Sequence, residues 1–127
     1  MVVDVTLENK RARLEPLSLA NYKLLIPAAS QKKLVQFSPS DIETPEKLRA
    51  YVLEALKQKA NGEAIPFLVY DRLKNAYAGC TRFMNIDPKN KVLEIGSTWI
   101  GREFQGTGLN RAIKTLMIDH TFGAMGF

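Results

Sequence analysis

The residues of this chain that are best suited to chemistry lie in a short glycine-containing segment, Gln105-Gly106-Thr107-Gly108-Leu109-Asn110. This segment follows a strand-like run and precedes a helical pattern. Backbone N–H groups at the start of a helix have no partner within the helix, and the helix dipole adds partial positive charge there. Because glycine has no Cβ, the main chain at Gly106 and Gly108 can approach a ligand closely. The segment therefore predicts a binding site for phosphate.

Two widespread phosphate-binding loops fit this segment poorly. The nucleotide P-loop requires Lys followed by Ser or Thr after its last glycine, whereas Leu109 and Asn110 follow here. The dinucleotide fingerprint requires a third glycine three residues after Gly108, and that position is Arg111. A different kind of phosphate-binding loop must therefore be considered.

The spacing Gln105-x-x-Gly108-x-Asn110 resembles the pyrophosphate loop of the GNAT superfamily, the acyl-CoA-dependent N-acyltransferases. The family pattern has Gly or Ala at the last position, so Asn110 departs from it. Glu94-Ile95-Gly96 ahead of the loop, and Asp119-His120-x-Phe122 in the helix after it, are similar to the ribosomal-protein and amino-terminal acetyltransferase-like branch. The resemblance covers essentially the whole chain and implies transfer of an acetyl group from acetyl-CoA to a primary amine.

This resemblance also implies roles for individual residues. Glu94 matches the position from which the family often takes a general base. Backbone N–H groups of Trp99, Ile100 and Gly101 would hold the pantetheine arm of the cosubstrate. The pyrophosphate would be bound by Gln105, Gly106, Thr107, Gly108, Leu109 and Asn110. The adenosine-side phosphate could meet any of three basic residues, Arg102, Arg111 or Lys114.

Each candidate also has a purely structural interpretation. Ser97 is a polar rival to Glu94 on the opposite strand face, and Glu94 itself could be a solvated strand residue. Trp99 could be a core anchor, and His120 fits a packing role late in the last helix better than a catalytic one. Cys80 fits a small buried residue. No His, Cys and Asp cluster has metal-ligand spacing, so we expect no metal.

Composition limits the classes of protein that need to be considered. The chain has 127 residues, 46% of them hydrophobic, which is enough for one folded domain with a core. A single cysteine excludes an internal disulfide framework, and no apolar run has the length of a membrane span. We therefore expect a cytoplasmic protein without a membrane partner. The net charge of +5 is scattered, which makes nucleic acid an unlikely partner and allows steering of a phosphorylated small molecule.

Periodicity predicts the elements that must position the loop. Alternation predicts strands over Val3–Glu8 and Arg11–Leu17, and then a helix from Leu19 to about Ser30. Ser18 would cap this helix, Pro27 would end or bend it, and it would bury Leu24 and Leu25.

The second half of the pattern is clearer. Thr44-Pro45 starts a helix that stops at Asn61-Gly62. Three strands in meander order follow, and Gly79 indicates a bulge or bend in the second of them. The last helix would then bury four apolar side chains. The three strands are Pro66–Tyr70, Ala76–Ile86 and Val92–Ile100; the last helix is Leu109 to about Gly123, burying Ile113, Leu116, Met117 and Phe122.

These elements predict an α+β fold with a mixed, mostly antiparallel sheet. The resemblance implies that residues 1–127 are a single, incomplete GNAT-like domain. The family continues with a strand, a helix and a final strand, whereas this sequence stops after the helix that follows the loop, at Gly126-Phe127. We therefore expect an exposed strand edge that a homo-oligomer or strand exchange would cover. The leading hypothesis is an N-acetyltransferase; the alternative is a non-catalytic CoA-binding or oligomerising module.

Overall fold

The computed structural model describes residues 5–29, 42 and 44–127. The predicted loop from Gln31 to Asp41, and the start of the strand predicted from Val3, lie outside the described residues. Five strands and five helical segments are present in the described part: β1 Leu7–Glu8, β2 Ala12–Pro16, η1 Tyr22–Leu25, α1 Ile26–Ala29, α2 Pro45–Ala60, β3 Ile65–Asp71, β4 Ala76–Asp87, β5 Val92–Ile100, η2 Arg102–Phe104 and α3 Leu109–Phe122.

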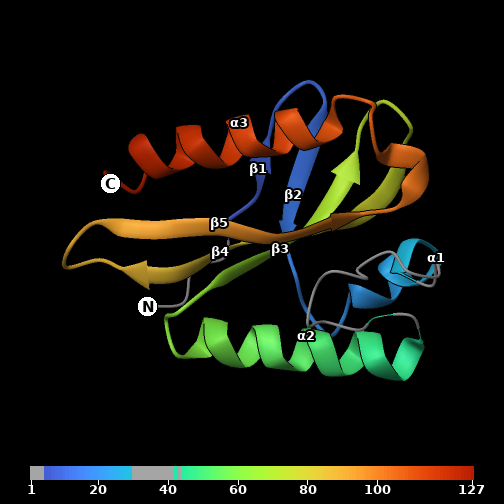
Figure 1. Cartoon of the computed structure of the whole chain (residues 1–127), viewed down its shortest axis with the longest axis horizontal. Coiled ribbons are helices and arrows are strands. Elements are labelled where there is room, and N and C mark those ends of the chain that lie inside the picture. Colours follow the sequence, from blue (N-terminus) through green and yellow to red (C-terminus); the bar gives the residue numbers. More distant parts are fainter. Residues whose placement is uncertain (1–4, 30–41, 43) are drawn as a thin grey trace.

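The strands form one antiparallel sheet in the order β1-β2-β3-β4-β5. Helix α3 lies across one face of this sheet, and α1 and α2 lie on the other (Figure 1). Each face buries its own apolar cluster, with Phe83, Ile113 and Met117 under α3 and Leu48, Val52 and Leu68 under α2. The predicted α+β class and the meander from β3 to β5 are therefore confirmed.

Helix α2 begins where the sequence predicts. The Lys47 amide donates to Thr44 Oγ1 at 3.2 Å, and Pro45 occupies the first helical position. Proline is tolerated there because its missing N–H would have no helical partner. The helix buries Leu48, Val52 and Ala55 against the sheet and ends at Asn61.

The helix predicted from Leu19 to about Ser30 is wrong in its start and its buried face, and its predicted end at Ser30 lies outside the described residues. The chain forms the short 3₁₀ turn η1 and then α1, and Ser18 Oγ accepts from the amides of Ala20 and Asn21 ahead of them. The 3₁₀ turn has three residues per turn, which changes the face that each residue presents. Leu25 is fully buried, whereas Leu24 is 48% exposed.

Gly79 lies where β4 and β5 approach most closely. A Cβ placed on Gly79 would lie 1.9 Å from the Trp99 carbonyl oxygen, so only glycine fits there. The predicted irregularity is present as a register shift against β3 between Val69 and Tyr70. A second shift gives β5 one extra residue between Gly96 and Trp99, opposite the β4 segment from Cys80 to Arg82. Such bulges bend a strand and re-aim its groups.

Strand β5 is the last strand of the sheet, as expected from the sequence. Helix α3 buries Ile113 and Met117 and half-buries Leu116, as predicted. The prediction for Phe122 is wrong, because its side chain is 69% exposed at the last turn of the helix. Ile118 on the same helix and Val92 on β5 are exposed as well. Apolar surface therefore accompanies the open strand edge.

Candidate functional site

The candidate site is the loop that connects β5 to α3. After Ile100 the chain makes the 3₁₀ turn η2 and reaches α3 at Leu109. Phe104 and Leu109 are buried and fix the two ends of the loop in the core beneath α3. Gln105 folds back so that its side-chain amide donates to the Ile100 carbonyl at 3.1 Å. The loop is therefore anchored to the core on one side, and its other side is exposed at Gly106 and Gly108.

Two glycines give the loop a backbone shape that other residues resist. Gly106 has φ of 72° and Gly108 has φ of 88°, both in the left-handed region, and Gly108 is the N-cap residue of α3. A Cβ placed on either glycine would meet nothing within 4 Å. The glycines are needed for their conformation, and the space beside them is open to a ligand.

A run of amides in this loop has no acceptor inside the described part of the chain. The Gln105 amide donates to the Arg102 carbonyl at 3.2 Å, and the next amide with a backbone acceptor is that of Ala112, which donates to Gly108 at 3.2 Å. The six amides from residue 106 to residue 111 lie between them. They coincide with the N-terminus of a 14-residue helix, where the dipole favours an anion.

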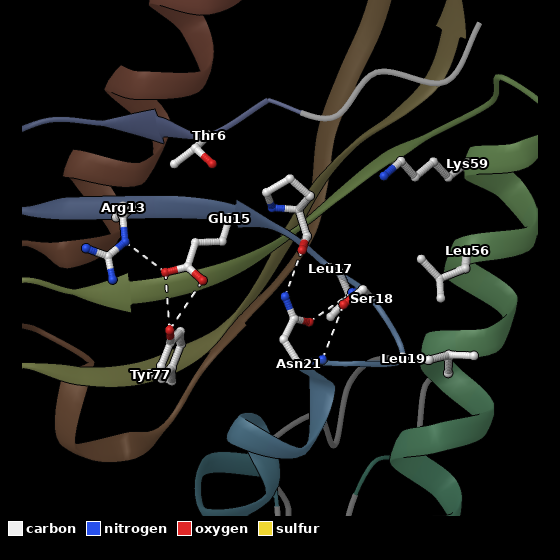
Figure 2. Close-up of a pocket in the computed structure, with 11 residues that line it drawn as sticks. Thr6, Arg13, Glu15, Leu17, Ser18, Leu19, Asn21, Leu56, Lys59 and Tyr77 are labelled. Atoms are coloured by element: carbon white, nitrogen blue, oxygen red, sulfur yellow. Dashed lines mark hydrogen bonds and ion pairs between the residues drawn. The ribbon is translucent and has the colours of Figure 1, made fainter.

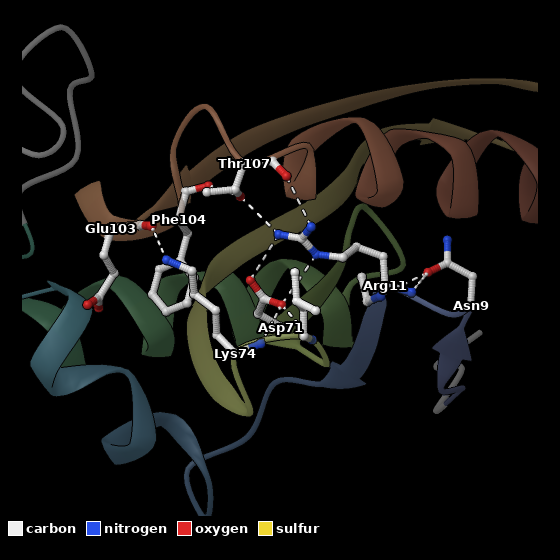
Figure 3. A network of polar contacts seen from close by, with 9 residues as sticks. Asn9, Arg11, Asp71, Lys74, Glu103, Phe104 and Thr107 are labelled. Carbon is white, nitrogen blue, oxygen red and sulfur yellow. Dashed lines mark hydrogen bonds and ion pairs between the residues drawn. The ribbon is translucent and has the colours of Figure 1, made fainter.

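A partly buried ion pair supports the loop from behind (Figure 3). Arg11, in the turn before β2, pairs with Asp71 at 3.2 Å and also donates to Thr107 through two nitrogens. Asp71 is fully buried and accepts the amides of Leu73 and Lys74 as well. Sequence reasoning missed this contact, because nothing local connects positions 11 and 107.

The strand that leads into the loop has one amide directed at its open side. The Gly101 amide donates to the Ala78 carbonyl at 2.9 Å, so it belongs to the β4–β5 ladder and cannot hold a ligand. Successive amides of an extended chain point in opposite directions, so the amide of Ile100 faces the free edge of β5. The Trp99 side chain is buried under the α2 face as a core anchor, and its indole N–H has no partner in the described structure.

Glu94 is exposed on β5 opposite Met84. Its neighbours Leu93 and Ile95 pack on the α3 side, so the Glu94 side chain belongs to the other face of the sheet. Glu94 lies seven positions before Gly101, which corresponds to about 23 Å along a strand. The structure thus does not bring Glu94 to the loop itself. The side chain of Ser97, the rival candidate, lies outside the described residues.

The remaining candidates lie in several places. Lys114 donates to Thr98 Oγ1 on β5 at 2.9 Å, and desolvation lowers its pKa. Arg102 and Arg111 are exposed at opposite ends of the loop. His120 stacks on Phe83 with the ring centroids 5.9 Å apart, far along α3 from the loop. Cys80 is buried, and burial raises the pKa of its thiol to about 12, which fits an inert core residue.

A separate hollow of about 880 Å³ lies on the α2 side of the sheet (Figure 2). Its polar groups are partnered by one another: Arg13 pairs with Glu15 at 2.8 Å, and Tyr77 donates to the same carboxylate at 3.2 Å. Asn21 likewise bridges the Ser18 amide and the Pro16 carbonyl. The polar groups here stabilise the fold, in contrast to the partnerless amides of the loop.

Within residues 5–29, 42 and 44–127, no group of three or more His, Cys, Asp or Glu side chains could hold a metal ion. The helices of this part are also too short or too polar to cross a membrane. The candidate that remains in the described chain is a helix N-terminus with partnerless amides beside strand β5, an arrangement that favours an anion.

Comparison with known proteins identifies the family. The model of the acetyltransferase (GNAT) domain matches residues 11–127, nearly the whole chain. The chain therefore belongs to the GNAT superfamily. Among curated proteins, none matches the chain in sequence.

Solved structures share the fold at low sequence identity. A GCN5-related N-acetyltransferase from Brucella melitensis is 25% identical with a TM-score of 0.86, over 98% of this chain and 57% of its own. A putative ribosomal-protein-serine acetyltransferase from Vibrio cholerae is 17% identical with a TM-score of 0.80, over 99% of this chain and 71% of its own. RimL, a ribosomal L7/L12 α-N-protein acetyltransferase in complex with coenzyme A, is 21% identical with a TM-score of 0.71, over 91% and 67% respectively. The chain thus spans 57 to 71% of the length of these neighbours.

Proposed function

We propose that the chain is an acetyl-CoA-dependent N-acetyltransferase that modifies a primary amine, on a protein N-terminus or on a small molecule. One observation carries the proposal: six consecutive amides at the start of α3 lack acceptors in the described chain and border open space at two glycines. An anion is the natural partner of such amides. Membership of the GNAT superfamily supports the diphosphate of an acyl-CoA as that anion.

The rest of the cosubstrate would follow β5. With its diphosphate on Gln105, Gly106, Thr107, Gly108, Leu109 and Asn110, the pantetheine arm would run back along the free edge of this strand. The Ile100 amide faces that edge and would donate to the arm, while the Gly101 amide is already bonded to β4. CoA carries its thiol at the far end of a long arm, so a reaction centre well away from the loop is expected.

Glu94 is our candidate for the general base. An α-amino group has a pKa of about 8 and a lysine side chain one of about 10.4, so the acceptor arrives mostly protonated and cannot attack. The Glu94 carboxylate, directly or through water, would accept that proton. The neutral amine then attacks the thioester carbonyl, a C–N bond forms, the C–S bond breaks, and CoA leaves as the thiolate, while the nitrogen loses its second proton to water.

We also propose that the open edge of β5 is covered by a second copy of the chain, by dimerisation or strand exchange, in a cytoplasmic protein. The edge is the end of the sheet order, and exposed Val92, Ile118 and Phe122 lie on β5 and on α3. Sedimentation tests this directly, because a folded monomer with no apolar surface detectable by dye binding would contradict it.

Calorimetry with CoA and acetyl-CoA tests the cofactor site. We expect binding by the native chain and none by Gly108→Glu, which places a carboxylate where the diphosphate belongs. Gly126→Glu is the matched control, because Gly126 also has a positive φ and open space but lies beyond the other end of α3. Absence of CoA binding by the native chain, with Gly108→Glu behaving identically, would refute the cofactor site.

Thiol release from acetyl-CoA with a panel of peptide and small amines tests the reaction. We expect turnover with at least one amine and a loss in Glu94→Gln of about 10²–10⁴-fold, the usual contribution of a general base. The exposed helical Glu54→Gln gives the same charge change away from β5. Binding of CoA without turnover of any amine would favour the non-catalytic binding module.

A further inference from the structure

We propose that Arg11 is a positioning residue, which directs the Gly108 amide toward the diphosphate by holding the Thr107 carbonyl inward. The inference rests on the proposed function for its ligand, and on the contacts of Arg11 for its mechanism. Arg11 precedes β2, and Thr107 lies between the two glycines of the loop. The two residues are 96 positions apart in sequence.

The geometry of one peptide unit carries the argument. Arg11 Nη1 donates to the Thr107 carbonyl oxygen at 3.0 Å, and this carbonyl belongs to the peptide that ends in the Gly108 N–H. In a planar trans peptide the C=O and N–H bonds point in opposite directions. Because Arg11 lies beneath the loop (Figure 3), drawing the carbonyl inward turns the Gly108 N–H outward, to the open side.

The loop needs such a contact because its glycines restrain it weakly. Gly106 and Gly108 lack side chains and populate many backbone conformations at similar free energy. Between them, Thr107 is the one residue whose side chain can anchor the segment. Its hydroxyl accepts from Arg11 Nη2 at 3.0 Å and donates to the Phe104 carbonyl. The carbonyl and hydroxyl of Thr107 are thus both held by a single guanidinium group.

Asp71 fixes the guanidinium itself. Its carboxylate accepts from Arg11 Nε at 3.4 Å and from Nη2 at 3.2 Å, and it is fully buried. It also accepts the amides of Leu73 and Lys74, which hold it in the turn after β3. Arginine is needed because its planar group presents several donors in fixed directions, whereas lysine offers a single ammonium group. Arg11→Lys can keep the pair with Asp71 but cannot also hold both oxygens of Thr107.

Two substitutions separate positioning from a purely structural ion pair. Arg11→Lys removes the planar guanidinium group with its several donors and keeps the positive charge. Thr107→Val removes the hydroxyl and leaves both the Arg11–Asp71 pair and the Nη1 bond to the Thr107 carbonyl in place, so it tests the hydroxyl contact separately even if Arg11→Lys does not fold. The controls are Thr107→Ser, which retains the hydroxyl, and Arg72→Lys, which makes the same change at a nearby arginine that bonds the Asn9 carbonyl and does not touch the loop.

The first measurement needs no ligand. Amide hydrogen exchange at Gln105 and Ala112 follows the two backbone bonds that bracket the loop. We expect exchange to be about tenfold faster in Arg11→Lys and in Thr107→Val, the size of one charged hydrogen bond, and unchanged in both controls. The acceleration in the double variant should be smaller than the product of the two single accelerations, because both changes remove the bond from Arg11 Nη2 to the Thr107 hydroxyl. Unchanged exchange in folded single variants, or effects that multiply in the double variant, would overturn the proposal.

The second measurement is the dissociation constant for CoA by calorimetry. We expect about tenfold weaker binding in Arg11→Lys and native affinity in the control Arg72→Lys. Affinity within twofold of native in Arg11→Lys, with exchange accelerated, would show that Arg11 holds the loop without aiming the amide, and would overturn the proposal. If the native chain does not bind CoA, the proposed function fails, whereas the exchange data still decide whether Arg11 fixes the loop.

Discussion

Gly108→Ala separates backbone strain from ligand binding at the start of α3. With φ of 88°, Gly108 holds a left-handed conformation that costs an L-residue about 1–2 kcal/mol. Nothing lies within 4 Å of the added Cβ, so no steric clash adds to this cost. If the backbone keeps its shape, the whole strain appears as a loss of folding free energy of about 1–2 kcal/mol, or about 5 °C in melting temperature.

The chain has one alternative, which is to rotate the backbone at residue 108 and relieve the strain. The amides around residue 108 would then turn away from the open side, and CoA affinity would fall while stability is retained. Urea denaturation and calorimetry on the same samples measure both quantities, and we expect at least one of them to decrease by about 1 kcal/mol. Gly126→Ala carries the same strain at the other end of α3 and should leave CoA affinity unchanged. A Gly108→Ala protein with native stability and native affinity would refute the requirement for glycine.

Three further outcomes follow from burial and packing. Gly79→Ala forces a Cβ to 1.9 Å from the Trp99 carbonyl oxygen. We therefore expect urea denaturation to show a loss of about 3 kcal/mol in the free energy of unfolding, or the variant not to fold. A near-native denaturation midpoint would contradict the close approach of β4 and β5. Burial raises the pKa of the Cys80 thiol to about 12. At pH 8 a disulfide reagent should therefore react with Cys80 only after denaturant is added. Rapid labelling of the folded chain would show that the thiol is accessible. Desolvation lowers the pKa of His120 below 6.5, so the neutral form is favoured in the folded state, and stability should decrease as the pH falls below about 6.5. His120→Gln should reduce that decrease, and identical pH profiles would disprove the assignment.

Local patterns in the sequence were enough to predict much of this fold. The cap at Thr44, the stop at Asn61-Gly62 and the order of the three strands that follow are decided by neighbouring residues. The position of the loop ahead of α3 could also be predicted from local sequence, because the closely spaced glycines are followed directly by a helical pattern. Around Pro27 the local signals were too weak to distinguish a 3₁₀ turn from an α-helix, so the buried face was assigned wrongly at Leu24.

Features that depend on distant contacts were not predictable. The extra residue in β5 between Gly96 and Trp99 appears only in its pairing with β4. The exposure of Phe122 depends on what packs at the end of α3, which helical periodicity does not contain. Nothing in the local sequence marks Asp71 as fully buried or Arg11 as its partner, because their contact comes from tertiary packing.

The contact between Arg11 and Thr107 has a consequence for how the chain acquires its shape. A contact between residues 96 positions apart closes a loop that contains most of the chain. Such long-range contacts form slowly compared with local turns. Arg11 and Thr107 are synthesised far apart in time, so the loop cannot take its final shape until synthesis has reached Thr107, just ahead of α3. We therefore expect a nascent chain to gain affinity for coenzyme late and in a single step, after its first strand has docked.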